Sequence, residues 1–82
     1  MRLPRDVGGE ELAKLLGRYG YEFVRQTGSH MRLSVEGEHE HHITIPRHKP
    51  LKPGTLSGIL RDVAEHRGVD RNTLIEEMFG KK

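Results

Sequence analysis

The fold is decided by the stretch YEFVRQTGSHMRLSVEGEHEHHITI, residues 21–45. Apolar and polar residues alternate in three short runs of this stretch, and a period of two is typical of strands that are buried on one face. We expect strands at residues 21–26, 29–36 and 41–45, with turns at Thr27-Gly28 and at Gly37. Pro46 lacks an N–H group and should end the third strand. Three consecutive strands with short turns predict an antiparallel meander.

The alternation also assigns side chains to the two faces of the predicted sheet. One face should be apolar and contribute to the core, through Met31, Leu33, Val35, Ile43 and Ile45. The other face should point away from the core and carries His30, Arg32, Ser34, His42 and Thr44. In the first strand, Tyr21 and Phe23 share one side.

Helical periodicity flanks the strands on both sides. Apolar residues at positions i, i+3, i+4 and i+7 predict a helix from about Gly9 to Tyr19, which Gly20 should end in a left-handed conformation. A second helix should open at Pro53-Gly54-Thr55 and end at Gly68. Asp70 is the expected N-cap of a short helix over 71–79. The apolar stripes of the two main helices are Leu12, Leu15, Leu16 and Tyr19, and Leu56, Ile59, Leu60 and Val63.

This order of elements predicts an α+β fold, α-β-β-β-α, with a short C-terminal helix. Both main helices should cover one face of a three-stranded antiparallel sheet and leave the other face bare. The chain has 82 residues, and we expect residues 1–82 to form a single domain. Without cysteine, the chain has no disulfide and no thiol nucleophile. No apolar run is long enough for a membrane span and no signal peptide is evident, so we expect a cytoplasmic protein.

The placement of charge is more informative than the net charge of +2. No Asp or Glu occurs between Glu22 and Glu36, or between Glu40 and Asp62. A positive field is therefore expected over the middle of the chain, and a polyanion is the natural partner. The basic residues of these stretches are Arg25, Arg32, Arg47, Lys49, Lys52 and Arg61.

The tripeptide Gly28-Ser29-His30 sets an imidazole at the start of the second strand, directly after a turn. The strand period points His30 away from the core, toward a bound partner. Gly28 is the expected structural turn residue, because a tight turn can need a positive φ there, which would fix where the imidazole emerges. A turn glycine that serves folding alone remains an alternative.

Four blocks of the sequence are the basis of a family resemblance: LLGRYGYE at 15–22, QTGSH at 26–30, IPRH at 45–48 and LKPGTL at 51–56. In this order and spacing they resemble the HicA-type toxins, the small ribonuclease partners in HicA/HicB toxin-antitoxin pairs. The resemblance implies a fold like that of double-stranded-RNA-binding domains, cleavage of messenger RNA, growth arrest and neutralisation by a HicB-type antitoxin. It also implies that the catalytic histidine is His30. One departure is Gly8-Gly9 before the first helix, a weaker cap than Ser or Thr.

The chemistry of such a site can be stated from the residues themselves. RNA carries its own nucleophile, the 2′-hydroxyl, so cleavage needs a base, cations that stabilise the charge on phosphorus, and an acid for the leaving oxygen. We expect His30 to be the base or the acid, with no metal and no other cofactor, and a 2′,3′-cyclic phosphate and a 5′-hydroxyl as products. His48 and His42 are candidates for a second proton-transfer group. The RNA-binding candidates are Ser29, Arg32, Arg47, His48, Lys49 and Lys52.

Other functions were weighed against this hypothesis. His39, His41 and His42 could bind a transition metal, but without cysteine or a helical histidine motif a dedicated site is not expected. The main alternative is a non-catalytic RNA-binding module that reads RNA shape. Base stacking is disfavoured because the outward strand positions carry no aromatic residue. An adaptor that binds only protein would leave the acid-free basic stretches unexplained. Besides RNA, the expected partner is an acidic antitoxin protein that covers the bare sheet face.

Overall fold

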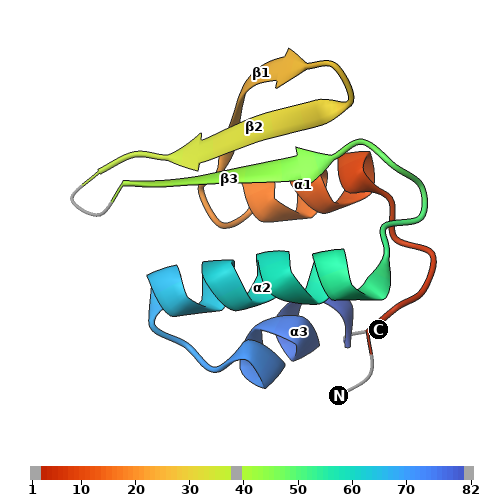
Figure 1. Cartoon of the computed structure of the whole chain (residues 1–82). Helices are drawn as coiled ribbons and strands as arrows, with labels where there is room; N and C mark the ends of the chain where they lie inside the picture. Colours follow the sequence, from red (N-terminus) through yellow and green to blue (C-terminus); the bar gives the residue numbers. More distant parts are fainter. Residues whose placement is uncertain (1–2, 38–39, 81–82) are drawn as a thin grey trace. The chain divides into compact units, whose positions relative to one another are not determined.

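The computed structural model describes residues 3–37 and 40–80 (Figure 1). The elements follow the order α1, β1, β2, β3, α2, α3. This confirms the predicted α+β class and the α-β-β-β-α order with an additional C-terminal helix. The chain forms two compact units. The first unit is Asp6–Leu51, and the second combines the residues before Asp6 with those from Lys52 onward. That residues 1–82 form one domain, with both main helices on one sheet face, stays a prediction.

The first unit begins with α1, Gly9–Gly17. Beyond its last assigned residue the chain keeps winding, and Gly20 adopts a φ of 92°. The amide of Gly20 donates to the carbonyl of Gly17 over 3.2 Å, and the amide of Tyr21 donates to that of Leu16 over 3.2 Å. This pair of bonds is the Schellman arrangement, which needs a left-handed residue in the position of Gly20. The predicted role of Gly20 is therefore confirmed, although the assigned helix is shorter than predicted.

A three-stranded antiparallel sheet follows, with strand order β1-β2-β3. Its strands are β1, Glu22–Thr27, β2, His30–Val35, and β3, His41–Pro46. The predicted meander and its turn glycines are confirmed, since Gly28 and Gly37 both have positive φ. The prediction that Pro46 ends the third strand at Ile45 is wrong, because β3 includes Pro46 as the register partner of His30. The backbone amide of Arg47 donates to the carbonyl of Ser29, so pairing between β2 and β3 continues one step past Pro46.

One face of the sheet is buried against α1 (Figure 1). The prediction that this face is apolar and buried is confirmed for Met31, Leu33, Ile43 and Ile45, because each is less than 8% exposed. Val35, also predicted for this face, is only half-buried at the end of β2. Leu12 and Leu16 of α1 are completely buried, and Tyr21 is 3% exposed. Hydrophobic burial on this single face fixes the register, because a one-residue slip would turn the apolar side chains to solvent.

β1 is an edge strand, and its pairing with β2 shifts register between Phe23 and Arg25. Val24 is the extra residue of a β-bulge, which turns the following side chains to the opposite face. Phe23 lies opposite Leu33, on the α1 side of the sheet, yet its side chain is 57% exposed. Phe23 is therefore on the same side of the sheet as the buried Tyr21, but it remains exposed because it lies at the edge strand.

The second face of the sheet, here called the open face, carries three rows of side chains that follow from the register. The rows are Thr27-His30-Pro46, Arg25-Arg32-Thr44 and Glu22-Ser34-His42. Most of these residues are exposed, as predicted for His30, Arg32, His42 and Thr44. Ser34 is the exception at 7% exposure, because a short side chain in the middle strand is shielded by the longer side chains on both sides.

The second unit contains α2, Pro53–Arg67, and α3, Arg71–Phe79. Gly68 ends α2 with a φ of 72°, and Asp70 caps α3 by accepting from the amides of Asn72 and Thr73. These predictions are confirmed, as is the buried stripe of Leu56, Ile59, Leu60 and Val63. Across the part of the chain that the structure describes, no helix combines the length and apolar character needed to cross a membrane.

Candidate functional site

His30 is the first residue of β2 and follows a two-residue turn, Gly28-Ser29. Gly28 has a φ of 60°, whereas none of the non-glycine residues among those described has a positive φ. A positive φ at the first turn residue alone is the pattern of a type II′ hairpin turn, which matches the twist of the flanking strands. The turn therefore fixes the backbone direction at His30, whose side chain is exposed on the open face.

Side chains from β1, from the segment after β3 and from α1 are linked to this turn. Gln26 Nε2 donates to the carbonyl of Gly28 over 3.0 Å. The Oε1 atom of Gln26 accepts from Arg47 Nη1 over 3.4 Å. Arg47 Nε also forms an ion pair with Glu10 of α1. Because the backbone amide of Arg47 donates to Ser29 over 2.6 Å as well, Arg47 links α1, the end of β3 and the turn before His30.

The start of α1 lies directly against the segment after β3. The amide of Gly9 donates to the carbonyl of His48 over 2.8 Å. A Cβ atom on Gly9 would lie 2.0 Å from the carbonyl oxygen of Pro46, which no side chain could tolerate. A Cβ on Gly8 would lie 3.1 Å from Lys49 Cγ. Gly8 does act as an N-cap without a side-chain bond, but the sequence analysis missed that Gly9 allows this close backbone approach.

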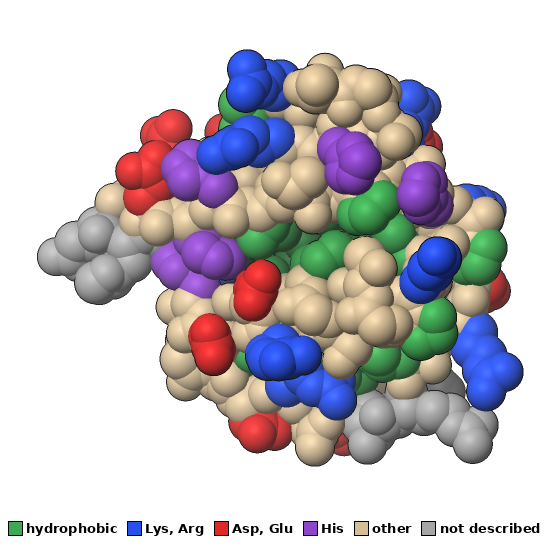
Figure 2. Space-filling view, viewed as in Figure 1, with side chains coloured by type: hydrophobic (Ala, Val, Ile, Leu, Met, Phe, Trp, Pro, Cys, Tyr) green, Lys and Arg blue, Asp and Glu red, His purple; other side chains and the backbone are tan. Residues whose placement is uncertain are grey.

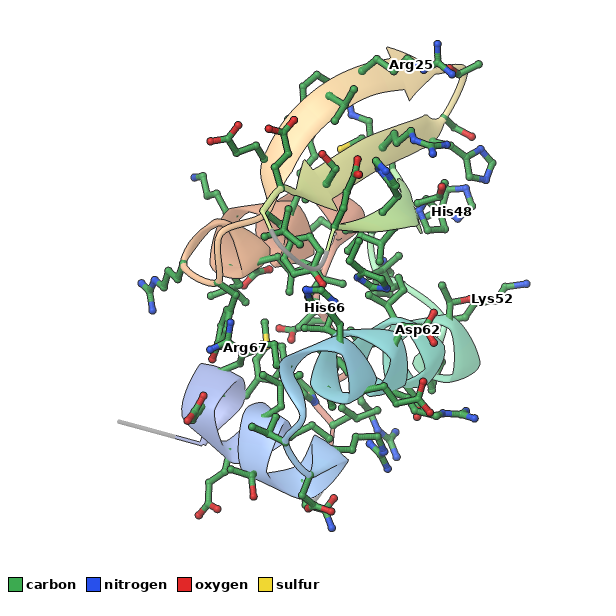
Figure 3. The ribbon with its side chains drawn as sticks, turned by 90° about the vertical axis from the view of Figure 1, so that its left-hand side faces the viewer. Arg25, His48, Lys52, Asp62, His66 and Arg67 are labelled. Atoms are coloured by element: carbon green, nitrogen blue, oxygen red, sulfur yellow. The ribbon has the colours of Figure 1, made fainter. Side chains whose placement is uncertain are left out.

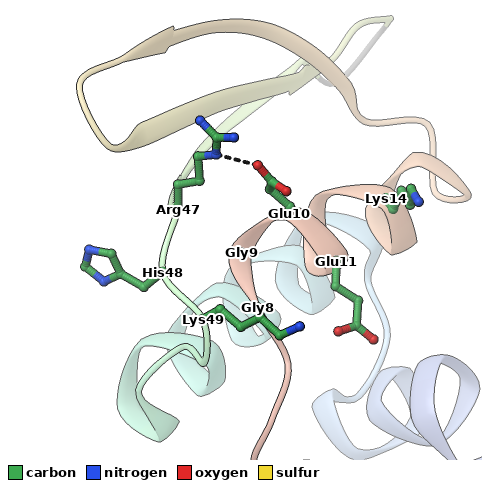
Figure 4. Close-up of a pocket in the computed structure, with 8 residues that line it drawn as sticks. All are labelled: Gly8, Gly9, Glu10, Glu11, Lys14, Arg47, His48 and Lys49. Carbon is green, nitrogen blue, oxygen red and sulfur yellow. Dashed lines mark hydrogen bonds and ion pairs between the residues drawn. The ribbon is translucent and has the colours of Figure 1, made fainter.

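A groove of about 420 Å³ lies beside this contact (Figure 4). Three predicted RNA-binding residues, Arg47, His48 and Lys49, line it, and the acids Glu10 and Glu11 lie on its other side. In Figure 4 the side chain of Arg47 points toward Glu10, whereas that of His48 points away from α1. The groove thus brings these three residues together, with Arg47 already engaged by an acid.

Arg32 lies two residues after His30 on β2, on the same open face. Directly opposite Arg32 on β1 is Arg25. Arg25 is one of the basic residues of the acid-free stretches, but it was not predicted as a site residue. A strictly alternating β1 would point Arg25 to the same side as Phe23, and the bulge at Val24 turns it to the open face.

The other histidines of the sheet lie toward its far end. His42 is opposite Ser34, four residues along β2 from His30, which corresponds to about 13 Å. It pairs with Glu40 over 3.0 Å. His48 lies nearer to His30 along the ladder, because it follows Pro46, the register partner of His30, by two residues.

The Nδ1 atom of His41 and the Tyr21 hydroxyl share a hydrogen bond of 2.6 Å. His39 lies outside the described residues, so the suggested role of the three neighbouring histidines is untested. Within residues 3–37 and 40–80, no group of three or more His, Cys, Asp or Glu side chains is arranged to hold a metal ion.

The remaining predicted residues are Ser29 and Lys52. Ser29 is exposed in the turn before His30. Lys52 is the N-cap residue of α2, in the second unit, and its side chain extends away from the helix (Figure 3). Figure 2 shows histidine and basic side chains together on the surface over the sheet.

Comparison with known protein families gives a match to the model described as HicA toxin of bacterial toxin-antitoxin, over residues 9–64. The matched segment begins with α1, includes all three strands and ends within α2. It therefore contains the turn at Gly28, His30 and the groove residues after β3. Searches of curated proteins and of solved structures gave no significant match.

Proposed function

Because the chain belongs to the HicA toxin family of bacterial toxin-antitoxin systems, we propose that it is an endoribonuclease that cleaves messenger RNA with His30 as its catalytic histidine. Cleavage of messenger RNA would inhibit translation and growth, and a HicB-type protein would be the antitoxin of a type II pair. The observation that carries the proposal is the position of His30, an exposed imidazole held by a rigid turn next to cationic side chains on the open face.

The reaction begins at the ribose 2′-hydroxyl next to the scissile phosphate. His30 accepts the 2′-hydroxyl proton as the new bond between the 2′-oxygen and phosphorus forms. The bond from phosphorus to the 5′-oxygen then breaks, and this oxygen takes a proton from an acid. The products are a 2′,3′-cyclic phosphate and a 5′-hydroxyl, with no net oxidation or reduction. The nucleophile belongs to the substrate, so this chemistry needs no metal ion.

Each of the other candidate residues has a proposed role in this reaction. Arg32 holds a phosphate of the RNA strand next to the scissile one, and the Ser29 hydroxyl donates a hydrogen bond to the same strand. His48 supplies the proton to the 5′-oxygen, because it lies only two residues beyond Pro46, the register partner of His30. Arg47, Lys49 and Lys52 contact phosphates farther along the RNA.

The antitoxin would act by covering the open face. The histidine and arginine side chains of the open face are exposed. An acidic partner would neutralise their charge while excluding RNA. We propose that such a complex forms in the cytoplasm, where the messenger RNA is found.

The proposal is tested with purified wild type, His30→Ala and His42→Ala on a defined RNA in the presence of EDTA. His42 is the matched control, because it is also an exposed histidine on the open face. We expect His30→Ala to lower the cleavage rate about 10²- to 10⁴-fold, while His42→Ala retains activity. The RNA ends should be a 2′,3′-cyclic phosphate and a 5′-hydroxyl, and a 2′-deoxy substitution at the cleavage site should block the reaction.

Equal cleavage by the wild type and His30→Ala, or wild-type activity that EDTA abolishes and magnesium restores, would contradict the proposal. The alternative function, a non-catalytic RNA-binding module, predicts a different result. In that case the wild type binds RNA without cutting it, and His30→Ala only weakens binding.

A further inference from the structure

Arg25 and Arg32 face each other across the β1–β2 ladder on the open face. Directly opposite residues of antiparallel strands have Cβ atoms about 4.5–5.5 Å apart, and like charges in such positions destabilise a sheet. The bulge at Val24 creates this pair, because it turns Arg25 to the side of Arg32. The fold therefore places two permanent positive charges together at a cost in stability.

Neither arginine forms an ion pair with an acid of the described residues. The third residue of the row is Thr44, and the adjacent row toward the turn is Thr27-His30-Pro46. Glu22 is the one acid among the rows of the open face, and it lies opposite Ser34. Glu10 forms an ion pair with Arg47, and Glu40 forms one with His42. Both guanidinium groups are thus left to an anion from outside the protein.

The chemistry of two guanidinium groups points to a phosphate. Each guanidinium is a planar fork of N–H donors that matches the oxygens of a phosphate group, and charge-assisted bonds of this type are the stronger hydrogen bonds of proteins. An anion between them would also remove their mutual repulsion. A carboxylate could do the same, but the neighbouring His30 is the proposed site of phosphodiester cleavage.

We propose that Arg25 and Arg32 together hold one phosphate of the RNA strand, next to the phosphate at which His30 acts. His30 and Arg32 are two residues apart on β2, which corresponds to about 6.7 Å along the strand. The RNA backbone then follows β2 across the open face, from the turn toward Ser34. This inference rests on the proposed function, and it assigns to Arg25, one of the basic residues expected to face a polyanion, a specific phosphate contact.

A binding role and a structural role predict opposite changes in the free protein. If the two arginines serve to bind an anion, neutralising either one relieves repulsion, so the melting temperature without RNA should stay equal or rise. If the aliphatic parts or the charges of the two arginines stabilise the sheet, the same substitution should lower the melting temperature of the free protein. This comparison needs only the free protein.

The test uses Arg25→Gln, Arg32→Gln, the double variant and Arg18→Gln. Arg18 is the matched control, because it is an exposed arginine in the same unit, at the C-cap of α1. The probe is a short 2′-O-methyl RNA, which lacks the nucleophile and is not cleaved. Affinity is measured as a function of salt concentration, and the melting temperature of each free variant is recorded.

We expect Arg25→Gln and Arg32→Gln each to weaken binding about tenfold and to reduce the slope of log K against log salt by up to about 0.7, the contribution of one phosphate. The double variant should lose less affinity than the two single losses combined, because both groups hold one phosphate. Arg18→Gln should leave the slope unchanged. Arg25→Lys should keep most of the salt dependence but lose affinity for the RNA, because lysine retains the positive charge without the forked N–H donors of a guanidinium group.

A slope for Arg25→Gln equal to that of Arg18→Gln, or a lower melting temperature for the neutralised variants, would overturn the inference. Because the probe cannot be cut, this result is independent of catalysis. A wild type that does not cleave RNA but shows the expected slopes would contradict the proposed function and leave the phosphate site standing.

Discussion

The backbone amide of Arg47 donates to the carbonyl oxygen of Ser29 over 2.6 Å. This bond joins the residue after β3 to the residue before His30. The side chain of Arg47 approaches the same turn by a second route, through Gln26, whose amide group donates to Gly28. Two sets of hydrogen bonds therefore hold the turn before the proposed catalytic histidine. One is the backbone bond from Arg47 to Ser29, and the other is the side-chain relay from Arg47 through Gln26 to Gly28.

Substitution of Gln26 tests this relay. Gln26→Ala removes the bond to the Gly28 carbonyl and the acceptor for Arg47, and we expect it to cost about 0.5–1.5 kcal/mol of stability and to slow cleavage. Gln26→Glu keeps an acceptor for Arg47 but loses the donor to Gly28. If the bond to Gly28 matters for His30, both variants should lower kcat more than they raise KM. Unchanged kcat in both would show that the relay does not position His30.

The positive φ of Gly28 predicts the effect of a methyl group there. A Cβ on Gly28 would meet no atom within 4 Å, so the cost of Gly28→Ala is conformational, about 1–2 kcal/mol. Gly17→Ala is the matched control, because its Cβ also meets nothing within 4 Å and its φ is not positive. We expect denaturant titration to show a loss of stability for Gly28→Ala, and no loss for Gly17→Ala. Cleavage per folded molecule should fall for Gly28→Ala alone.

Gly9 predicts a steric effect rather than a conformational one. Gly9→Ala would place its Cβ 2.0 Å from the Pro46 carbonyl oxygen, which forces α1 away from the end of β3. We expect a loss of about 1–3 kcal/mol and exposure of the Gly9 amide to solvent in hydrogen exchange. Gly8→Ala should cost less, because the atom it meets, Lys49 Cγ at 3.1 Å, belongs to a flexible side chain. Equal losses for the two variants would contradict the contact between α1 and Pro46.

Local sequence signals predicted most of the elements because each signal acts through neighbouring residues. Gly20 and Gly68 end helices through bonds within the last turn, and the alternation around Leu33 sets a strand face without reference to distant residues. The bulge at Val24 could not be predicted in this way, because it depends on which residue of β2 lies opposite. The same holds for the contact of Gly9 with Pro46. Arg25 was therefore missed as a site residue, although its charge was noted.

Arg47 has an ion-pair partner, Glu10, that is distant in the chain and that the sequence did not predict. Sequence analysis assigned Arg47 to RNA, but its guanidinium pairs with Glu10 in the free protein. Both groups are largely exposed, at 47% and 62% of their side-chain surface, and an exposed pair of this kind contributes less than about 1 kcal/mol. A phosphate could therefore replace Glu10 at little cost.

Glu10→Gln tests whether the acid competes with RNA for Arg47. Removing the carboxylate frees the guanidinium, so we expect tighter binding of a 2′-O-methyl RNA and a steeper salt dependence, with a loss in stability below about 1 kcal/mol. Glu11→Gln is the matched control, because Glu11 lines the same groove and the substitution changes the net charge equally. If both variants bind more tightly by the same factor, the gain comes from the overall charge. A gain confined to Glu10→Gln, and abolished by adding Arg47→Gln, would identify Arg47 as the phosphate ligand.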